Sequence, residues 1–228
     1  MLTIAEVFYQ PGKLFASLGD RAAAWILPLA ADIAVLVAST AAVVNLVGME
    51  TIVRQRLAGT NLSPEQMQRA LDRVASSNAA YFSYAGAAST GILTVLVVAG
   101  LLMVFALMVE KKPKFSTVLA MVALAFLPYW LISGLMTTLV LVASPDRTAL
   151  DLTNLLATNA GVFLNKETAG KGLYSVMSSI DLLSFLAIGM LGYGFSKVTR
   201  CSAGTGVGAV FILWVLFVFA KAAAASLF

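Results

Sequence analysis

Two carboxylates are the side chains of this sequence with the clearest potential for chemistry. Asp32 and Asp181 are the only ionisable residues well inside predicted membrane spans, where a charge costs at least about 2.5 to 3.5 kcal/mol on insertion scales. Each acid therefore needs a hydrogen-bond partner, water or a proton, so each is a candidate for an ion or proton route. The competing interpretation, which we favour, is that both acids are structural hydrogen-bonding groups.

The surroundings of the two acids differ. Asp181 shares a helical face with small and polar residues such as Ser184, whereas the face around Asp32 is mostly apolar and includes Ser39. An inward-facing position is therefore better supported for Asp181. The acids lie in antiparallel predicted spans, at depths that differ by on the order of 10 Å at 1.5 Å per residue. They are not expected to share a proton as an aspartic-protease pair does.

The composition limits other chemistry. The chain has no His and a single Cys, Cys201, and so lacks the usual ligand sets of zinc, haem and iron–sulfur sites. Its 15 Lys and Arg residues are spread over short loops without a continuous basic face, which argues against a nucleic-acid partner. We therefore expect no catalytic residue, no cofactor and no metal, and a protein that is not an enzyme. A lipid-modifying enzyme is a third hypothesis, in which the base would have to be a carboxylate.

Membrane helices are predicted to position these side chains. Of the 228 residues 60% are hydrophobic and 11% are charged, and the mean hydropathy is +0.92, which is too apolar for a soluble domain. We predict an all-α, polytopic transmembrane helical bundle in which residues 1–228 form a single domain in the lipid bilayer. Its five spans are expected at about 24–47, 81–109, 115–142, 174–195 and 203–220.

Two long polar loops, 48–79 and 146–172, are expected to contain short amphipathic helices. In the first loop, Ser63-Pro64-Glu65-Gln66 predicts an N-cap Ser followed by a Pro at the first helical position, and Gly59-Thr60-Asn61 predicts a turn. This loop is therefore expected to be a helical hairpin and the surface best suited to touch a partner. In the second loop, a helix is predicted from Ala149 to Ala157.

Proline and glycine predict how the spans bend and pack. Pro128 lies inside the third span, where a kink or break is expected. Gly189, Gly192 and Gly206, in spans four and five, form a face of small residues suited to close contact between helices. The N-terminal residues before span one contain Phe8, Phe15 and other apolar residues among polar ones, which predicts a short amphipathic segment at the membrane interface.

The orientation follows from the distribution of basic residues. The two short turns, between spans two and three and between spans four and five, are strongly basic, whereas the long loops mix basic residues with acids. Basic short loops favour the cytoplasmic side. We predict a cytoplasmic N-terminus and a C-terminus on the opposite side.

The order of these features resembles a known family. The segments that carry the resemblance are Phe8-x-x-Pro11-x-x-x-Phe15-x-x-Leu18, Trp25-x-x-Pro28, Asn159-x-Gly161-x-Phe163-Leu164, Ser178-Ser179-Ile180-Asp181-Leu182-Leu183-Ser184 and Gly194-Phe195-Ser196-Lys197. Together they are similar to the bacterial branch of the Yip family, the Ypt/Rab-interacting proteins (YIPF in animals), and the similarity covers essentially the whole chain. It implies a five-span, non-enzymatic membrane protein of the bacterial inner membrane.

The resemblance also implies partners. Eukaryotic members act in Golgi and endoplasmic-reticulum trafficking and bind small GTPases and one another, and some bacterial relatives look like accessory subunits of ABC-type exporters. Our first hypothesis is an integral membrane interaction or accessory protein that assembles with other membrane proteins or with itself. The alternative is a small oligomeric transporter or channel that uses Asp32 and Asp181.

Overall fold

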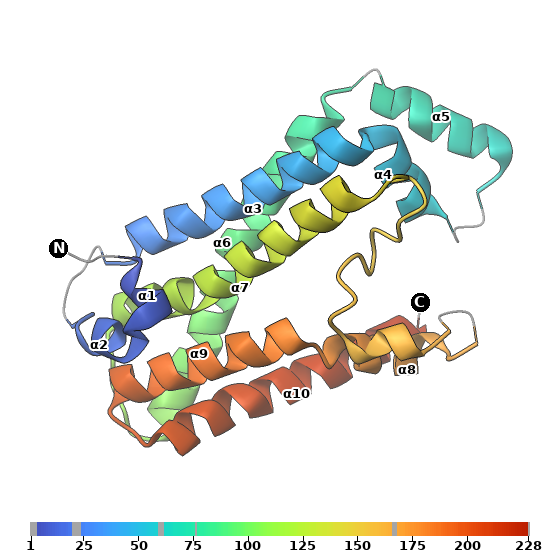
Figure 1. Ribbon diagram of the computed structural model, residues 1–228. Helices are drawn as coiled ribbons and strands as arrows, with labels where there is room; N and C mark the ends of the chain where they lie inside the picture. The colour runs from blue at the N-terminus through green and yellow to red at the C-terminus, as the bar shows by residue number, and fades with distance from the viewer. Residues whose placement is uncertain (1–3, 20–23, 59–61, 76, 166–167, 228) are drawn as a thin grey trace. The chain divides into compact units, whose positions relative to one another are not determined.

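The part of the chain that the computed structural model describes, residues 4–19, 24–58, 62–75, 77–165 and 168–227, is helical and contains no β-strand (Figure 1). The predicted all-α class is therefore confirmed. The helices are α1 Glu6–Tyr9, α2 Pro11–Ala16, α3 Ile26–Val47, α4 Met49–Leu57, α5 Pro64–Ala75, α6 Ala79–Met108, α7 Phe115–Ala143, the 3-10 turn η1 Ala160–Phe163, α8 Lys171–Ser179, α9 Leu182–Thr199 and α10 Ala203–Leu227.

Five of the described helices, α3, α6, α7, α9 and α10, are long and apolar enough to cross a membrane. α6 and α10 are apolar on every face, and both leave large hydrophobic side chains such as Leu93, Val97, Leu216 and Phe217 more than half exposed. An apolar surface of this kind is stable only against lipid or another protein. The first three predicted spans agree with the helices within two residues, and α10 continues to Leu227, beyond the expected end near residue 220.

The bounds predicted for the fourth span are wrong. It was expected to begin near Tyr174, but the chain is divided there into α8, which ends at Ser179, and α9, which begins at Leu182. Asp181 between them has extended backbone angles, φ −131° and ψ 138°. The sequence of apolar residues is continuous, but the backbone is not helical at this acid because its carboxylate caps the helix that follows.

The chain forms two compact units. Unit 1 comprises Met1–Asp32, Ile92–Trp130 and Ala157–Phe228, and unit 2 comprises Ile33–Gly91 and Leu131–Leu156. α3, α6 and α7 each contribute one part to unit 1 and the other part to unit 2.

The core of unit 1 surrounds the first half of α7, where every residue from 118 to 127 is buried. Gly194 of α9 brings its backbone against Met121 of α7 and Phe15, since a Cβ added at Gly194 would lie 2.9 Å from Met121 and 3.2 Å from Phe15. Leu14 and Phe15 of α2 are fully buried, and α2 packs on α9. The apolar side of the N-terminal segment thus packs against protein.

α10 packs along both α9 and α8 in unit 1 (Figure 1). The contact with α8 includes a hydrogen bond from Lys221 Nζ to Ser179 Oγ of 3.1 Å and a close approach of Gly172 to Ser226. α8 also contacts η1, so the C-terminal part of the second long loop is fastened to the helices.

Unit 2 carries the predicted helical hairpin, α4 and α5, which pack on each other. The predicted helix start is confirmed: the Ser63 hydroxyl accepts from the Gln66 N–H at 3.2 Å, and the Gln66 side chain accepts from the Ser63 N–H at 2.8 Å. This reciprocal pair is a capping box, which satisfies two of the donors left free at a helix start. The predicted turn at 59–61 lies outside the described residues.

The helix predicted from Ala149 to Ala157 does not form. The side chains of Asp146 and Asp151 accept hydrogen bonds from the backbone N–H groups of Thr148 and Thr153, at 2.9 and 2.8 Å. Such side-chain turns offer the backbone an alternative to helical bonding. Residues 149–157 are consequently irregular, and the first regular element after them in the described chain is η1.

Pro128 does not break the third span. α7 continues without interruption from Phe115 to Ala143, although a proline removes one backbone donor and crowds the preceding turn. The neighbouring residues Leu124 and Leu127 are 0% and 5% exposed, and packing by other helices is what allows a membrane helix to continue through proline. The kink predicted at this residue stays a prediction.

Candidate functional site

Asp181 is the centre of a hydrogen-bond cluster in unit 1. One carboxylate oxygen accepts from the Thr158 hydroxyl at 2.5 Å. The other accepts from the backbone N–H and the hydroxyl of Ser184, at 2.9 and 3.2 Å. The acid is therefore the N-cap of α9, and it also holds the loop that precedes η1. Sequence reasoning that placed it inside a span missed the signal Asp-x-x-Ser, which is typical of a helix start.

Backbone pairing reinforces the same connection. Asn159 and Asp181 form an isolated antiparallel bridge, with Ala160 N–H donating to Ile180 O at 2.9 Å and Leu182 N–H donating to Thr158 O at 3.1 Å. Two segments of the second half of the chain are thus joined where α8 gives way to α9. Both oxygens of the Asp181 carboxylate accept hydrogen bonds at this connection, which is what a structural acid requires.

The motif Asn159-x-Gly161 has a local physical explanation. The Asn159 side chain accepts from the Gly161 N–H at 3.0 Å and starts η1. A Cβ at Gly161 would lie 3.2 Å from the Ser178 backbone of α8. Glycine at this position therefore permits η1 to pack tightly on α8.

Asp32 is in a different situation. It lies in α3 with no exposed surface, and neither carboxylate oxygen has a hydrogen-bond partner among the residues that the structure describes. A buried carboxylate without a partner costs several kcal/mol. Asp32 and Asp181 share no hydrogen bond in the described chain.

Ser39 contributes to packing in unit 2. Its hydroxyl donates to the Val35 carbonyl one helical turn earlier, at 2.8 Å. A side chain at Gly134 of α7 would collide with Ser39, so the two helices approach closely at this pair. Ser39 therefore has a local acceptor and a packing role, in contrast to Ser184, which belongs to the Asp181 cluster.

Two of the three candidate packing glycines meet. A Cβ at Gly192 of α9 would collide with the backbone of Val207 in α10, and one at Gly206 would collide with the carbonyl oxygen of Gly192. Gly189 has no atom within 4 Å of the position that its Cβ would take. Gly192 and Gly206 thus set the closest contact between α9 and α10, and Gly189 takes no part in it.

The two loops of unit 2 form one ordered structure, which we call the loop module and define as α4, α5 and residues 144–156. Its centre is Gln55, whose side-chain NH₂ donates to the carbonyls of Thr148 and Leu150 at 3.1 and 2.8 Å and whose oxygen accepts from the Leu152 N–H at 3.1 Å. Beneath it lies an apolar core of buried Val47, Ile52 and Leu141, joined by partly buried residues of α3, α4 and the second loop: Val43, Val44, Leu46, Met49, Leu150, Leu152 and Leu155.

The outer surface of the loop module is polar. On α5, Leu71 is buried, whereas the residues of the opposite face are exposed. Exposed pairs lie along the helices, Glu50 with Arg54 at 2.9 Å and Glu65 with Arg69 at 4.0 Å. Asp146 at its edge accepts from both the hydroxyl and the N–H of Thr148, at 2.6 and 2.9 Å, and these hydrogen bonds lower the pKa of its carboxyl below the ordinary value.

A cavity of about 440 Å³ lies beside the loop module within unit 2. The polar residues that line it are Arg56 of α4, Thr40, Ser83 and Thr90. None of the described lining residues is acidic, and the set contains no base placed beside a nucleophile. The cavity can hold a polar or anionic group, but its side chains do not form the acid–base arrangement that hydrolysis needs.

Comparison with known families gives a match over nearly the whole chain: the Yip1 domain covers residues 5–224. The chain belongs to the Yip family. No curated protein and no solved structure is similar enough to match. As a Yip-family protein with five described helices able to cross a bilayer, it is a multi-pass integral membrane protein.

Proposed function

We propose that this Yip-family protein is a non-enzymatic component of membrane assemblies, and that its loop module is the surface that binds other membrane proteins. The observation that carries the proposal is the Gln55 clamp. It joins two loops separated by more than 90 residues through three hydrogen bonds. Loops that only connect spans need no shared core or clamp, because ordering a residue costs about 1 to 2 kcal/mol of backbone entropy.

The exposed face of α5 is suited to a protein partner. It is a helix with mixed charges, and its apolar side, which includes the buried Leu71, faces the inside of the module. Partner recognition through such a face would rest on polar contacts and charge complementarity rather than on an apolar groove. Exporter subunits are the first partners to test, since they are the assemblies that the resemblance to bacterial relatives implies.

The carboxylates support a role without turnover. Asp181 caps α9, and the Asp32 carboxylate has no hydrogen-bond partner among the described residues. The Yip family is a membrane-protein family that is not known as enzymatic. A bacterial inner-membrane location, with the N-terminus cytoplasmic and the C-terminus outside, fits the two basic turns at Lys111 and Lys197.

Site-specific photocrosslinking tests the partner surface. A photoreactive residue at Arg69, whose side chain is 78% exposed, is expected to capture the same partner repeatedly from native membranes. The matched position is Phe217 of α10, which is 63% exposed on an apolar helix face and is expected to capture lipid. Recovery of the chain alone from both positions, without a partner or a second copy, would overturn the proposal.

A paired substitution separates the loop module from general stability. Gln55→Ala removes the clamp, whereas Ser202→Ala removes an exposed hydrogen bond from the Thr205 N–H of 3.0 Å in unit 1, outside the loop module. Partner capture is expected to fall in the first variant and to stay in the second. Equal capture in both variants would show that the ordered module is not what the partner recognises.

A transporter or channel is the second candidate function, and the buried Asp32 favours it. A carboxylate without a partner inside a span is the kind of group found on ion and proton routes. The test is flux through proteoliposomes that contain the wild-type chain, Asp32→Asn or Asp181→Asn. A role for Asp32 requires flux in the wild type and its loss in Asp32→Asn, and either unchanged flux or no flux at all rejects this function.

A further inference from the structure

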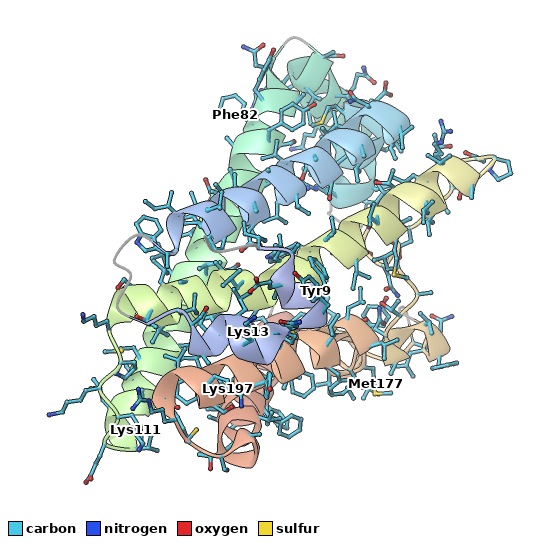
Figure 2. The ribbon with its side chains drawn as sticks, turned by 60° about the vertical axis from the view of Figure 1, so that its left-hand side comes forward. Tyr9, Lys13, Phe82, Lys111, Met177 and Lys197 are labelled. Atoms are coloured by element: carbon cyan, nitrogen blue, oxygen red, sulfur yellow. The ribbon has the colours of Figure 1, made fainter. Side chains whose placement is uncertain are left out.

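Three segments of unit 1 that are distant in the sequence meet around one cavity of about 380 Å³. They are the end of α2 with the following turn, the turn from α6 to α7, and the last turn of α9. Five basic side chains line the cavity: Lys111, Lys112, Lys114, Lys197 and Arg200. None of the described residues that line it is acidic. Figure 2 labels Lys111 and Lys197, which belong to two of these segments.

The walls of this basic cavity are held by buried contacts. The Thr117 hydroxyl, at the start of α7, donates to the carbonyl of Gly19 at 2.8 Å and ties two of the segments together. Thr117 and Thr199 are 8% and 5% exposed. The Lys197 ammonium lies 5.0 Å from the centre of the Tyr193 ring, within the range of a cation–π contact. The cations therefore extend from backbone segments that these contacts hold together.

Four of the five cations that line the basic cavity have no acidic partner among the described residues. Lys111, Lys112, Lys197 and Arg200 form no ion pair with an acid that the structure describes. Like charges that converge on one cavity repel one another, and the repulsion is stronger where water is partly replaced by protein. An anion in the cavity would remove this cost.

The position of the cavity indicates which class of anion it can bind. Its cations lie between the end of α6 and the start of α7 and at the last turn and C-cap of α9, at the ends of three helices able to cross a bilayer. This is the level of the lipid headgroups. The volume is at the lower end of the range for small-ligand pockets, about 300 to 1,000 Å³. Basic pockets among membrane helices are typical sites for anionic headgroups.

We propose that the basic cavity binds a phosphate group, and that an anionic phospholipid supplies it. Lys111, Lys112, Lys197 and Arg200 contact the phosphate, and the acyl chains extend along the apolar helices. This site is independent of the loop module, which belongs to unit 2. A substitution can therefore abolish lipid binding without abolishing partner binding, and the two proposals can be refuted separately.

Native mass spectrometry of the purified chain from nanodiscs tests the proposal. The nanodiscs contain phosphatidylcholine with a minor fraction of phosphatidylglycerol, and the wild type is expected to retain phosphatidylglycerol preferentially. Lys197→Gln/Arg200→Gln is expected to weaken this retention by on the order of 10- to 30-fold. Arg54→Gln/Arg69→Gln, which removes two exposed cations of unit 2, is expected to leave it unchanged.

Two further measurements keep the result interpretable. Basic residues also set topology, so the topology of each variant must be checked. Cys201 is the single cysteine and lies one residue after Arg200. Labelling it with an impermeant maleimide shows on which side of the membrane this turn lies.

Competition with inorganic phosphate identifies whether the bound phosphate group comes from a lipid or from a soluble compound. Retention that phosphate does not displace assigns the site to lipid, and displacement assigns it to a soluble phosphate compound. Equal retention of both lipids by the wild type, or unchanged retention in the cavity variant with normal topology, overturns the proposal.

Discussion

The role of Asp181 can be decided by comparing two substitutions at one position. Asp181→Ala removes the N-cap of α9 and leaves the Thr158 and Ser184 hydroxyls without this acceptor. Loss of an N-cap costs about 1 kcal/mol, within about 0.5 to 2, and loss of a hydrogen bond to a charged group costs about 1.5 to 3. The free energy of unfolding should therefore fall by about 2 to 4 kcal/mol.

Asp181→Asn should cost much less. Asparagine is as good an N-cap as aspartate, and its side-chain oxygen can still accept from the Ser184 N–H, so a loss below about 1 kcal/mol is expected. Each kcal/mol shifts the melting temperature of a chain of this size by about 2 to 4 °C. Thermal unfolding in detergent should give a melting temperature about 5 to 15 °C lower for the Ala variant and only slightly lower for the Asn variant.

The same comparison separates a structural acid from an ion-route acid. A structural N-cap predicts that Asn is tolerated in stability and in partner capture. If Asn destabilises the chain as much as Ala does, or if Ala has no effect on the melting temperature, the assignment of Asp181 as a capping residue is refuted. Ser184→Ala, which removes the weaker 3.2 Å hydroxyl contact and keeps the backbone bond, serves as the matched control.

Three other predictions follow from the same structure. Gly192→Ala should destabilise the chain by about 1 to 3 kcal/mol, because its Cβ collides with the Val207 backbone, while Gly189→Ala should be neutral or stabilising in thermal unfolding, because its Cβ meets open space. The pKa of Asp146 is lowered in the folded state, so its contribution is complete above the unfolded value of 3.8 and is lost as the pH falls through the lower folded pKa. The protection factors of residues 144–156 against hydrogen exchange, taken relative to the intrinsic rates at each pH, should therefore fall below about pH 4, and Asp146→Ala should abolish that fall. Gln55→Ala should accelerate exchange at residues 148–152 while α3 keeps its protection, and equal acceleration in α3 would contradict a local clamp.

The sequence alone was sufficient where the signal is local. Mean hydropathy over about twenty residues identified α3, α6, α7 and α10, because lipid requires an unbroken apolar helix of that length. The start of α5 was equally predictable, since Ser63 and Gln66 contact each other within one helical turn. The Yip family was recognised from short segments spread along the chain, and the match over residues 5–224 confirms it.

Local patterns failed where a side chain competes with the helix for backbone bonds. Asp181 lies within an apolar run that looks like a span, but its carboxylate finds Ser184 and Thr158 and divides the run. Asp151 accepts from the Thr153 N–H, which the expected helix at 149–157 would have used, and Asp146 accepts from the Thr148 N–H immediately before that helix. Hydropathy cannot reveal these choices, because it counts the polarity of a residue and not the partner that it meets.

Contacts between distant segments were decided by the tertiary structure only. Gln55 had no distinguishing sequence signal, since its partners lie 93 to 97 residues away. The turns at Lys111 and Lys197 were visible as basic, and their convergence with the end of α2 on one cavity was not. The sequence determined which segments enter the membrane, because transfer into lipid is a property of each segment. Packing determined which polar groups meet, because a hydrogen bond or a charge cluster depends on positions that no single segment specifies.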